Sequence, residues 1–111
     1  MTHAEVDQIF HALADATRRD IVRRVLDGEQ SVSGLARNYP ISVTAVQKHV
    51  AVLERAGLVS KRRQGREQRV SGEIDAIDRA RRLLDAYEDL WRGRVARMHD
   101  VLRDDSKGAH R

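Results

Sequence analysis

Cysteine is absent from this chain of 111 residues, which excludes both a disulfide framework and a thiolate metal site. No apolar run approaches the ~18 residues of a membrane-spanning helix, and the polar N-terminus lacks the apolar core of a signal peptide. Only four residues are aromatic, so the chain can bury a modest core, which self-association would help to stabilise. We therefore expect a single soluble, cytoplasmic domain spanning residues 1–111, with no membrane partner.

Basic residues are concentrated in one segment of a chain whose net charge is +4. Five of the nine residues from Lys61 to Arg69 are basic and one is acidic. Such a cluster favours a polyanionic partner, and the alternative is a solvated basic loop. The chain has no glycine-rich phosphate loop, no Ser/His/Asp arrangement and no redox cysteine, so we do not expect an enzyme.

Apolar residues recur at helical spacing in two segments near the N-terminus. The first segment predicts a helix near residues 4–14. The second predicts a helix that starts after Asp15, a suitable N-cap, and ends at Gly28. Its expected core face consists of Ile21, Val22, Val25 and Leu26.

Two further helices precede the basic segment. Ser31 or Ser33 can cap a short third helix, which must stop near Tyr39 because Pro40 disfavours a helical conformation in the residue before it. Ser42 can cap the fourth helix. Helical spacing directs three residues of this fourth helix to the core and leaves four facing outward: Val46, Val50 and Leu53 inward, and Val43, Thr44, Gln47 and Lys48 outward.

Two short strands follow the fourth helix, which Gly57 terminates. Residues 58–60 and 68–70 predict strands on either side of a turn at Gln64 and Gly65. The predicted order α-α-α-α-β-β-α is that of a mainly α (α+β) winged helix-turn-helix. In this fold one helix can enter the major groove of double-stranded DNA while the hairpin contacts the backbone or the minor groove.

A long helix is predicted over residues 74–102, in which apolar residues follow a heptad pattern. The apolar stripe is too long for so small a body to cover, so we interpret it as an intermolecular surface. The alternative is a helix that packs only on its own domain. Thus residues 4–72 form the helix-turn-helix and wing, residues 74–102 a dimerisation helix, and residues 103–111 a flexible tail. The predicted dimer interface consists of Phe10, Ile77, Leu84, Tyr87, Trp91 and Met98.

The outward face of the fourth helix carries residue types that read DNA. Gln47 can bond adenine bidentately, Lys48 can donate to guanine or to a phosphate, and Val43 and Thr44 can contact a thymine methyl group. Ser42, at the N-terminus of the helix, suits a phosphate contact. We therefore expect this helix to be the recognition helix.

Other candidate DNA contacts have structural alternatives. His49 borders the buried face, so a packed histidine and a phosphate contact are equal alternatives. In the wing, Arg63, Arg66 and Arg69 are the expected contacts, because arginine suits a narrow, electronegative minor groove. For each of them the alternative is pairing with an acidic side chain. We favour structural ion pairs over DNA contacts for two further arginines, Arg18 and Arg19.

With these motifs in place, the chain resembles the ArsR (ArsR/SmtB) family of bacterial winged-helix repressors over residues 5–102. The resemblance implies a homodimeric transcriptional repressor, of the branch without a cysteine metal site, that binds a pseudo-palindromic operator. Its two recognition helices would lie about one turn of DNA apart, ~34 Å. The matching segments, in order, are residues 13–19 with 21–22, 31–36, 42–53, 56–59 and 65–67, together with Tyr87 and Trp91.

Two features depart from the family pattern. Gly72 stands where relatives carry an apolar residue at the end of the second wing strand, which predicts a short strand. Where family sensors of soft metals place cysteines, this chain has residues 31–33, Ser-Val-Ser, and their neighbours. We therefore expect no metal site and no cofactor, with His99 and Asp100 the first residues to test.

Two alternative functions use the same fold. One is a metal- or small-molecule-responsive sensor, although the sequence identifies no effector. The other is a winged-helix module that binds a protein, with its basic wing facing an acidic partner. Release of DNA on addition of divalent metals tests the first, and salt-dependent binding to a preferred palindrome separates a regulator from the second.

Overall fold

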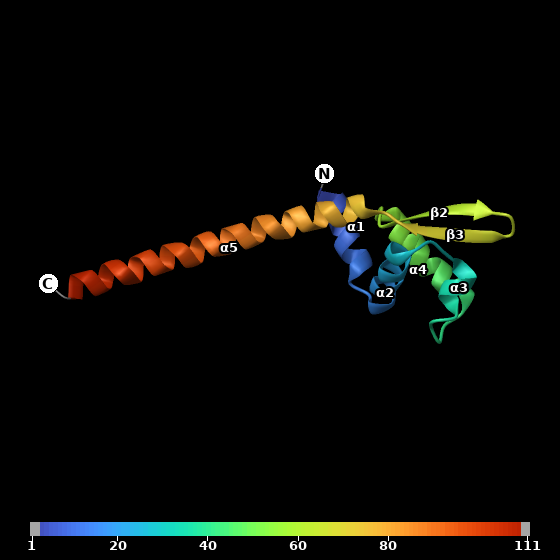
Figure 1. The fold of residues 1–111 in the computed structure, drawn as a ribbon, viewed down its shortest axis with the longest axis horizontal. Coiled ribbons are helices and arrows are strands. Elements are labelled where there is room, and N and C mark those ends of the chain that lie inside the picture. Colours follow the sequence, from blue (N-terminus) through green and yellow to red (C-terminus); the bar gives the residue numbers. More distant parts are fainter. Residues whose placement is uncertain (1–2, 110–111) are drawn as a thin grey trace. The chain divides into compact units, whose positions relative to one another are not determined.

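The computed structural model describes the backbone of residues 3–109 and the side chains of residues 3–103. The chain divides into two compact units, Met1–Ala80 and Arg81–Arg111. The mainly helical winged helix-turn-helix predicted from the sequence is confirmed, with one additional strand. The elements are α1 (His3–Leu13), α2 (Ala16–Asp27), β1 (Gln30–Ser31), α3 (Val32–Ala36), α4 (Val43–Arg55), β2 (Val59–Gln64), β3 (Glu67–Gly72) and α5 (Ile74–Ala109) (Figure 1).

Side-chain caps fix where α2, α3 and α4 begin. Asp15, Ser31 and Ser42 each accept a hydrogen bond from the backbone N–H three residues ahead, at 2.9, 3.0 and 3.0 Å. Each bond satisfies a donor that has no partner within the first turn of a helix. The predicted caps Asp15 and Ser42 are confirmed, and Ser31 rather than Ser33 caps α3. The α3 helix ends at Ala36, earlier than the limit that Pro40 imposes.

The sheet has three antiparallel strands in the order β1-β3-β2. Strand β1 was not predicted from the sequence, and its two residues pair with Val70 and Arg69 of β3. The expectation of a short second wing strand is wrong, because β3 pairs with β2 along its whole length, up to Gly72 opposite Val59. At the hairpin tip only Gly65, with φ 63°, has a positive φ, which is the pattern of a type II′ turn.

Gly72 allows a close approach between β3 and the end of α2. A Cβ atom at this position would lie 2.7 Å from Cδ2 of Leu26 and 3.1 Å from its Cα. The Leu26 side chain is 44% exposed, so its predicted place in the core face of α2 is wrong. Leu26 instead packs over Gly72.

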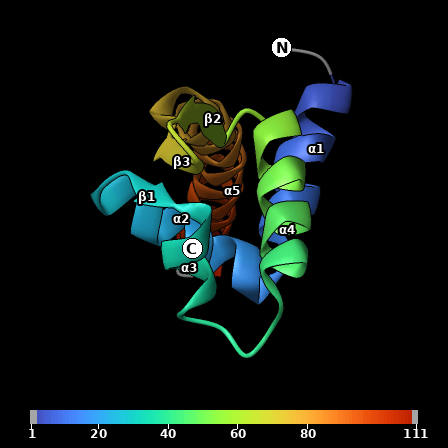
Figure 2. The ribbon, with the colours of Figure 1, turned by 90° about the vertical axis from the view of Figure 1, so that its right-hand side faces the viewer.

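The hydrophobic core lies in the first unit, where α4 contacts α1, α2 and α3 (Figure 2). The predicted inward residues of α4 are fully buried, and the remaining predicted residues of α2 are buried with them. The first two turns of α5 also belong to this core, because Ala76 and Ala80 are buried and Ile77 packs against them partly exposed. The other core side chains are Ile9, Ala12, Ile21, Val22, Val25, Val32, Leu35, Val46, Val50, Leu53, Ala56, Leu58, Val59 and Val70.

The second unit consists of the remainder of α5, whose backbone is helical to Ala109. The expected tail at residues 103–111 therefore begins within this helix. The side chains of residues 104–111, and residues 110–111 altogether, lie outside the described part of the chain. Within the described residues, no helix has a stretch that is both long and apolar enough to cross a membrane.

Candidate nucleic-acid interface

The α4 helix presents one buried and one exposed face. Val46, Val50 and Leu53 have no exposed surface and fix the helix to the core. On the opposite face the helix directs four side chains outward, and all four are exposed: Val43, Thr44, Gln47 and Lys48. An exposed valine, 45% accessible, at the start of a helix otherwise lined by polar groups provides an apolar contact of the kind that a thymine methyl group accepts.

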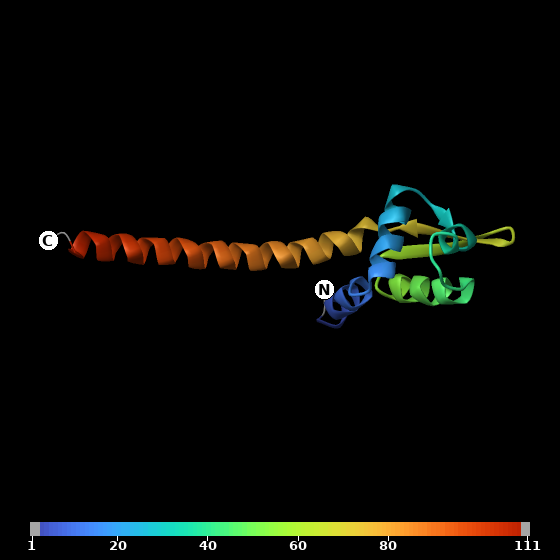
Figure 3. The ribbon, with the colours of Figure 1, turned by 90° about the horizontal axis from the view of Figure 1, so that it is seen from below.

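The N-terminus of α4 and the tip of the β2–β3 hairpin lie toward the same end of the first unit (Figures 1 and 3). Ser42, the N-cap of α4, is exposed beside the free N–H groups of the first turn. The hairpin tip projects beyond α3 and α4 in both views. The first unit thus brings the start of the predicted recognition helix and the tip of the wing to the same end.

His49 is held on the side of α4 that faces α2. Its Nδ1 lies 3.4 Å from Nη1 of Arg18 and 3.9 Å from Oδ2 of Asp15, and its side chain is 23% exposed. The guanidinium of Arg18 also donates to the backbone carbonyl oxygens of Ala12 and His11, at 2.7 and 3.1 Å. Of the two alternatives for His49, the structure shows the hydrogen-bonded, partly packed side chain.

Two arginines of α2 secure the end of α1. Arg18 binds the carbonyl groups of the last turn as described, and Arg19 donates to the carbonyl oxygen of Leu13 at 2.8 Å. Positive groups at a helix C-terminus satisfy free carbonyls and complement the helix dipole. Both residues have a structural role as predicted, but not through ion pairs: their guanidinium groups donate to backbone carbonyl oxygens.

A polar cluster links α2 to the turn that leads into α4. No pattern in the sequence predicted it. Tyr39 donates from its hydroxyl to Oδ2 of Asp20 at 2.6 Å, and its ring lies 5.9 Å from the guanidinium of Arg24. Burial, reinforced by the bond to Asp20, raises the pKa of Tyr39 to about 12. The donated bonds from Tyr39, Arg24 and Arg23 hold the pKa of Asp20 well below its ordinary value. The cluster therefore stays charged and hydrogen-bonded at neutral pH.

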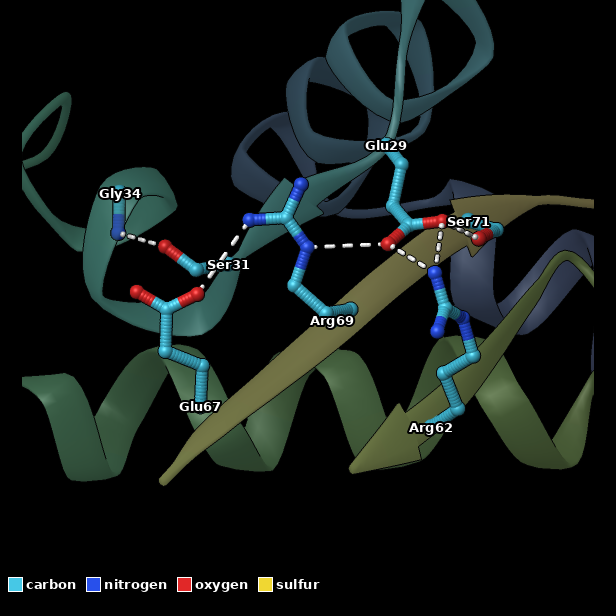
Figure 4. A network of polar contacts seen from close by, with 7 residues as sticks. All are labelled: Glu29, Ser31, Gly34, Arg62, Glu67, Arg69 and Ser71. Carbon is cyan, nitrogen blue, oxygen red and sulfur yellow. Dashed lines mark hydrogen bonds and ion pairs between the residues drawn. The ribbon is translucent and has the colours of Figure 1, made fainter. Parts of the chain in front are cut away.

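The wing contains two classes of arginine. Arg63 and Arg66 are exposed, and their side chains make no ion pair within the described residues. Arg62 and Arg69 instead share the carboxylate of Glu29, each with an N···O distance of 2.9 Å (Figure 4). Arg69, predicted as a DNA contact, is therefore acid-paired, which is the alternative that the sequence left open.

Glu29 is the centre of this network. Its Oε2 also accepts a bond from the Ser71 hydroxyl at 3.2 Å, and Arg69 reaches Oε2 of Glu67 at 3.5 Å (Figure 4). Bonds from Arg69 and then Arg62 lower the pKa of Glu29, and its carboxylate raises that of Arg69. No local pattern predicts these contacts, because Glu29 and Arg62 are 33 residues apart in the chain.

The predicted dimer-interface residues lie partly against the core of the first unit and partly on the exposed surface. Ile77 packs against the core of the first unit, whereas Phe10 on α1 is 36% exposed. In the second unit the remaining predicted residues form an exposed stripe, with Trp91 62% accessible. The large apolar side chains exposed on the described part of the second unit are Leu84, Tyr87, Leu90, Trp91, Met98, Val101 and Leu102.

A metal centre would need several side-chain ligands close together. Within the described residues, no group of three or more His, Cys, Asp or Glu side chains lies together. His99 and Asp100 are both exposed, and Asp100 pairs with Arg103 one turn further along the helix.

A helix-turn-helix domain family matches residues 13–62, which run from the end of α1 through α4 into β2. The chain is 45% identical over 64 residues to the helix-turn-helix transcriptional regulator Rv2034 of Mycobacterium tuberculosis. That match covers 58% of this chain, and the chain spans only 60% of the length of the relative.

Two solved structures share the fold over most of the chain. An ArsR-like transcriptional regulator from Rhodococcus sp. RHA1 is 32% identical, with a TM-score of 0.82 and coverage of 94% of this chain and 98% of that chain. The homodimeric winged helix-turn-helix DNA-binding domain of Mb0332 from Mycobacterium bovis, a possible ArsR-family regulator, is 25% identical with a TM-score of 0.63. In that case 78% of this chain and 80% of the other are covered.

Proposed function

Because this chain belongs to the ArsR family of helix-turn-helix transcriptional regulators, we propose that it binds an operator with two-fold symmetry as a homodimer and represses transcription there. The observation that carries the proposal is the two-faced α4 helix. Its buried valines and leucine hold it rigidly, while the polar and basic face remains exposed. A rigidly positioned helix with such a face suits the major groove.

In this proposal α4 reads bases and the wing contacts the backbone or the minor groove. Gln47 and Lys48 are the base-reading candidates, Val43 and Thr44 contact thymine methyl groups, and Ser42 contacts a phosphate. Arg63 and Arg66 are the wing contacts, because neither is engaged in an ion pair within the described residues. His49 and Arg69 support the interface from within, since both have intramolecular partners: Arg18 for His49 and Glu29 for Arg69.

Homodimerisation through α5, together with α1, accounts for the exposed apolar stripe of the second unit. A helix with this many large apolar side chains exposed to water would gain stability from a partner that covers them. The homodimeric state of the Mycobacterium bovis neighbour supports a second copy as that partner. The chain contains no cysteine, so a metal response through its own thiolates is excluded.

Selection of bound sequences from a random duplex library tests this function. We expect recovered duplexes to share two inverted half-sites whose centres lie one helical turn apart, and their binding to weaken steeply with salt. Recovery of sequences without a common motif, bound with the same affinity as scrambled DNA, would contradict the proposal. It would instead favour the protein-binding winged helix.

A further inference from the structure

Two arginines face each other across the strands of the wing. Arg62 of β2 is the direct cross-strand partner of Arg69 in β3 of the antiparallel hairpin. The Cβ atoms of direct cross-strand partners are ~5 Å apart, and like charges at that position destabilise a hairpin. The wing sequence thus contains a repulsion that the hairpin alone does not relieve.

A carboxylate from outside the hairpin lies between these two guanidinium groups. Oε1 of Glu29 accepts from Nη2 of Arg62 and from Nε of Arg69, both at 2.9 Å, and Oε2 accepts from Arg62 and from the Ser71 hydroxyl, both at 3.2 Å (Figure 4). The bridge therefore contacts both strands of the wing.

The backbone fixes the position of that carboxylate. Glu29 directly precedes β1, whose residues Gln30 and Ser31 pair with Val70 and Arg69. The same segment follows Gly28, which ends α2. Through Glu29 the wing is therefore attached, by side chain as well as backbone, to the body that carries α4.

We propose that Glu29 is a positioning residue that holds the wing in its DNA-binding orientation by bridging Arg62 and Arg69. This inference rests on the proposed function and assigns different roles to the arginines of the wing. Arg62 and Arg69 are structural, and Arg63 and Arg66, on the same hairpin, remain free for phosphate or minor-groove contacts. Glu29 acts through other residues and does not itself touch DNA.

Neutralising the bridge tests the proposal because charge and position predict opposite results. If Glu29 only repelled DNA, Glu29→Gln would tighten binding to every duplex. We expect instead about tenfold weaker binding to the selected operator, with binding to scrambled duplex unchanged or slightly tighter. Glu67→Gln is the matched control: it also removes one acidic group that contacts a wing arginine, but this carboxylate is 59% exposed and reaches only Arg69, at 3.5 Å. We expect operator binding of this control to equal or exceed that of the wild type.

A second variant separates the bridge from a direct role of Arg62. Glu29→Gln combined with Arg62→Gln removes the opposed charges, so operator affinity should recover toward the wild-type value. A further loss relative to Glu29→Gln would show that Arg62 contacts DNA and would overturn the proposal. The same double variant serves if Glu29→Gln alone does not fold.

Hydrogen exchange in the free protein tests the bridge without DNA. Amide protons of β2 and β3 should exchange at least several-fold faster in Glu29→Gln than in Glu67→Gln, and the double variant should restore their protection. Unchanged exchange in Glu29→Gln would overturn the inference even if DNA binding is confirmed. Faster exchange in a protein that binds no duplex would instead contradict the proposed function and leave the bridge established.

Discussion

At the scale of single residues, the side chains of α4 and the wing fall into two groups. Some are buried or ion-paired and hold the framework, and others are exposed and available for the proposed contact with DNA. On α4 this separation follows the helix period, with Val46 and Val50 buried and Gln47 and Lys48 exposed. In the wing it follows ion pairing rather than periodicity, because Arg62 and Arg69 are bound to Glu29 and Arg66 is not. Exposure alone therefore does not identify the contacts.

Gln47 is the residue whose loss should affect sequence recognition most selectively. Replacing it with alanine removes a bidentate partner for adenine, so Gln47→Ala should weaken operator binding by ~1–3 kcal/mol. Binding to scrambled duplex should stay nearly unchanged, because a lost base contact affects only the specific complex. Titration of both duplexes at one salt concentration checks this. An equal loss on both would place Gln47 among the backbone contacts.

The cap of α2 should make part of the stability depend on pH. The hydrogen bond from the Arg18 N–H lowers the pKa of Asp15 below its ordinary value of 3.8. A carboxyl group whose pKa is lower in the folded state stabilises the protein above its unfolded pKa, and this contribution is lost as the pH falls below about 4. Asp15→Ala should cost ~1 kcal/mol of unfolding free energy at pH 7, and Asp15→Asn less, because asparagine also caps.

Urea denaturation at a fixed protein concentration, at neutral pH and again near pH 3, measures this effect. The stability difference between the wild type and Asp15→Asn should shrink on acidification, because the aspartate loses its charge and the asparagine has none. A difference that stays constant across this range would show that the charge of Asp15 contributes nothing to the cap.

At the scale of secondary-structure elements, the sequence predicted those features that depend on local chemistry. Local sequence was enough to predict the N-caps Asp15 and Ser42, the inward face of α4 and the hairpin, because each depends on residues within a few positions of one another. Strand β1 could not be predicted, because two residues are too few to show an alternating pattern. The position of Leu26 was also missed, since helical spacing places it beside the core but tertiary packing leaves it over Gly72.

The candidate site was predicted to a similar extent. The exposed residues of α4 follow from its period, so their positions were correct. The partner of Arg69 is Glu29, forty residues earlier in the chain, and no local pattern joins the two. The packing of Ile77 against the core was missed for a related reason, because a heptad pattern does not show where the globular core ends and the exposed helix face begins.

The contact between Gly72 and α2 gives a prediction at this scale. Gly72→Ala would place a Cβ 3.1 Å from the backbone Cα of Leu26, so the strand and the helix must move apart. We expect a loss of ~1–3 kcal/mol in unfolding free energy, as for other overpacked sites. Gly28→Ala is the matched control, because Gly28 has φ 174° and nothing within 4 Å of an added Cβ.

Leu26→Ala can test the cause of that loss. In the double variant with Gly72→Ala, part of the lost stability should return, because the side-chain atoms nearest the new Cβ are removed. Chemical denaturation of the wild type, the two single variants and the double variant measures the four unfolding free energies that this comparison needs. Additive effects of the two changes would show that the glycine is needed for another reason.

At the scale of the whole molecule, DNA binding should depend on assembly. Trp91 is exposed at the centre of the apolar stripe of α5, and burying it between two protomers would dominate the interface. Trp91→Ala should cost ~3–5 kcal/mol in a packed interface and shift the sedimentation mass toward a monomer. In the proposed complex each protomer reads one half-site, so loss of the dimer should lower operator affinity even though α4 and the wing are unchanged.

Arg82→Ala provides the matched control for this change. Arg82 precedes Trp91 by nine residues, which places it on the opposite side of the same helix, and it is exposed. This variant should remain dimeric and bind the operator as the wild type does. If Trp91→Ala also stays dimeric at micromolar concentration, the seam on α5 must be reassigned.

The spacing of the half-sites tests the central claim most directly. Inserting five base pairs between the two halves of the selected operator rotates one by about half a turn, so a rigid dimer can no longer place both α4 helices in the major groove. We predict that affinity then falls toward that for a single half-site. An insertion of ten base pairs restores the facing of the half-sites but sets them about two turns apart, beyond the reach of a rigid dimer, so it should cause the same loss. The measurement is a titration of the wild-type protein against the three duplexes. Equal affinity for all three would contradict a homodimer that reads two half-sites through α4.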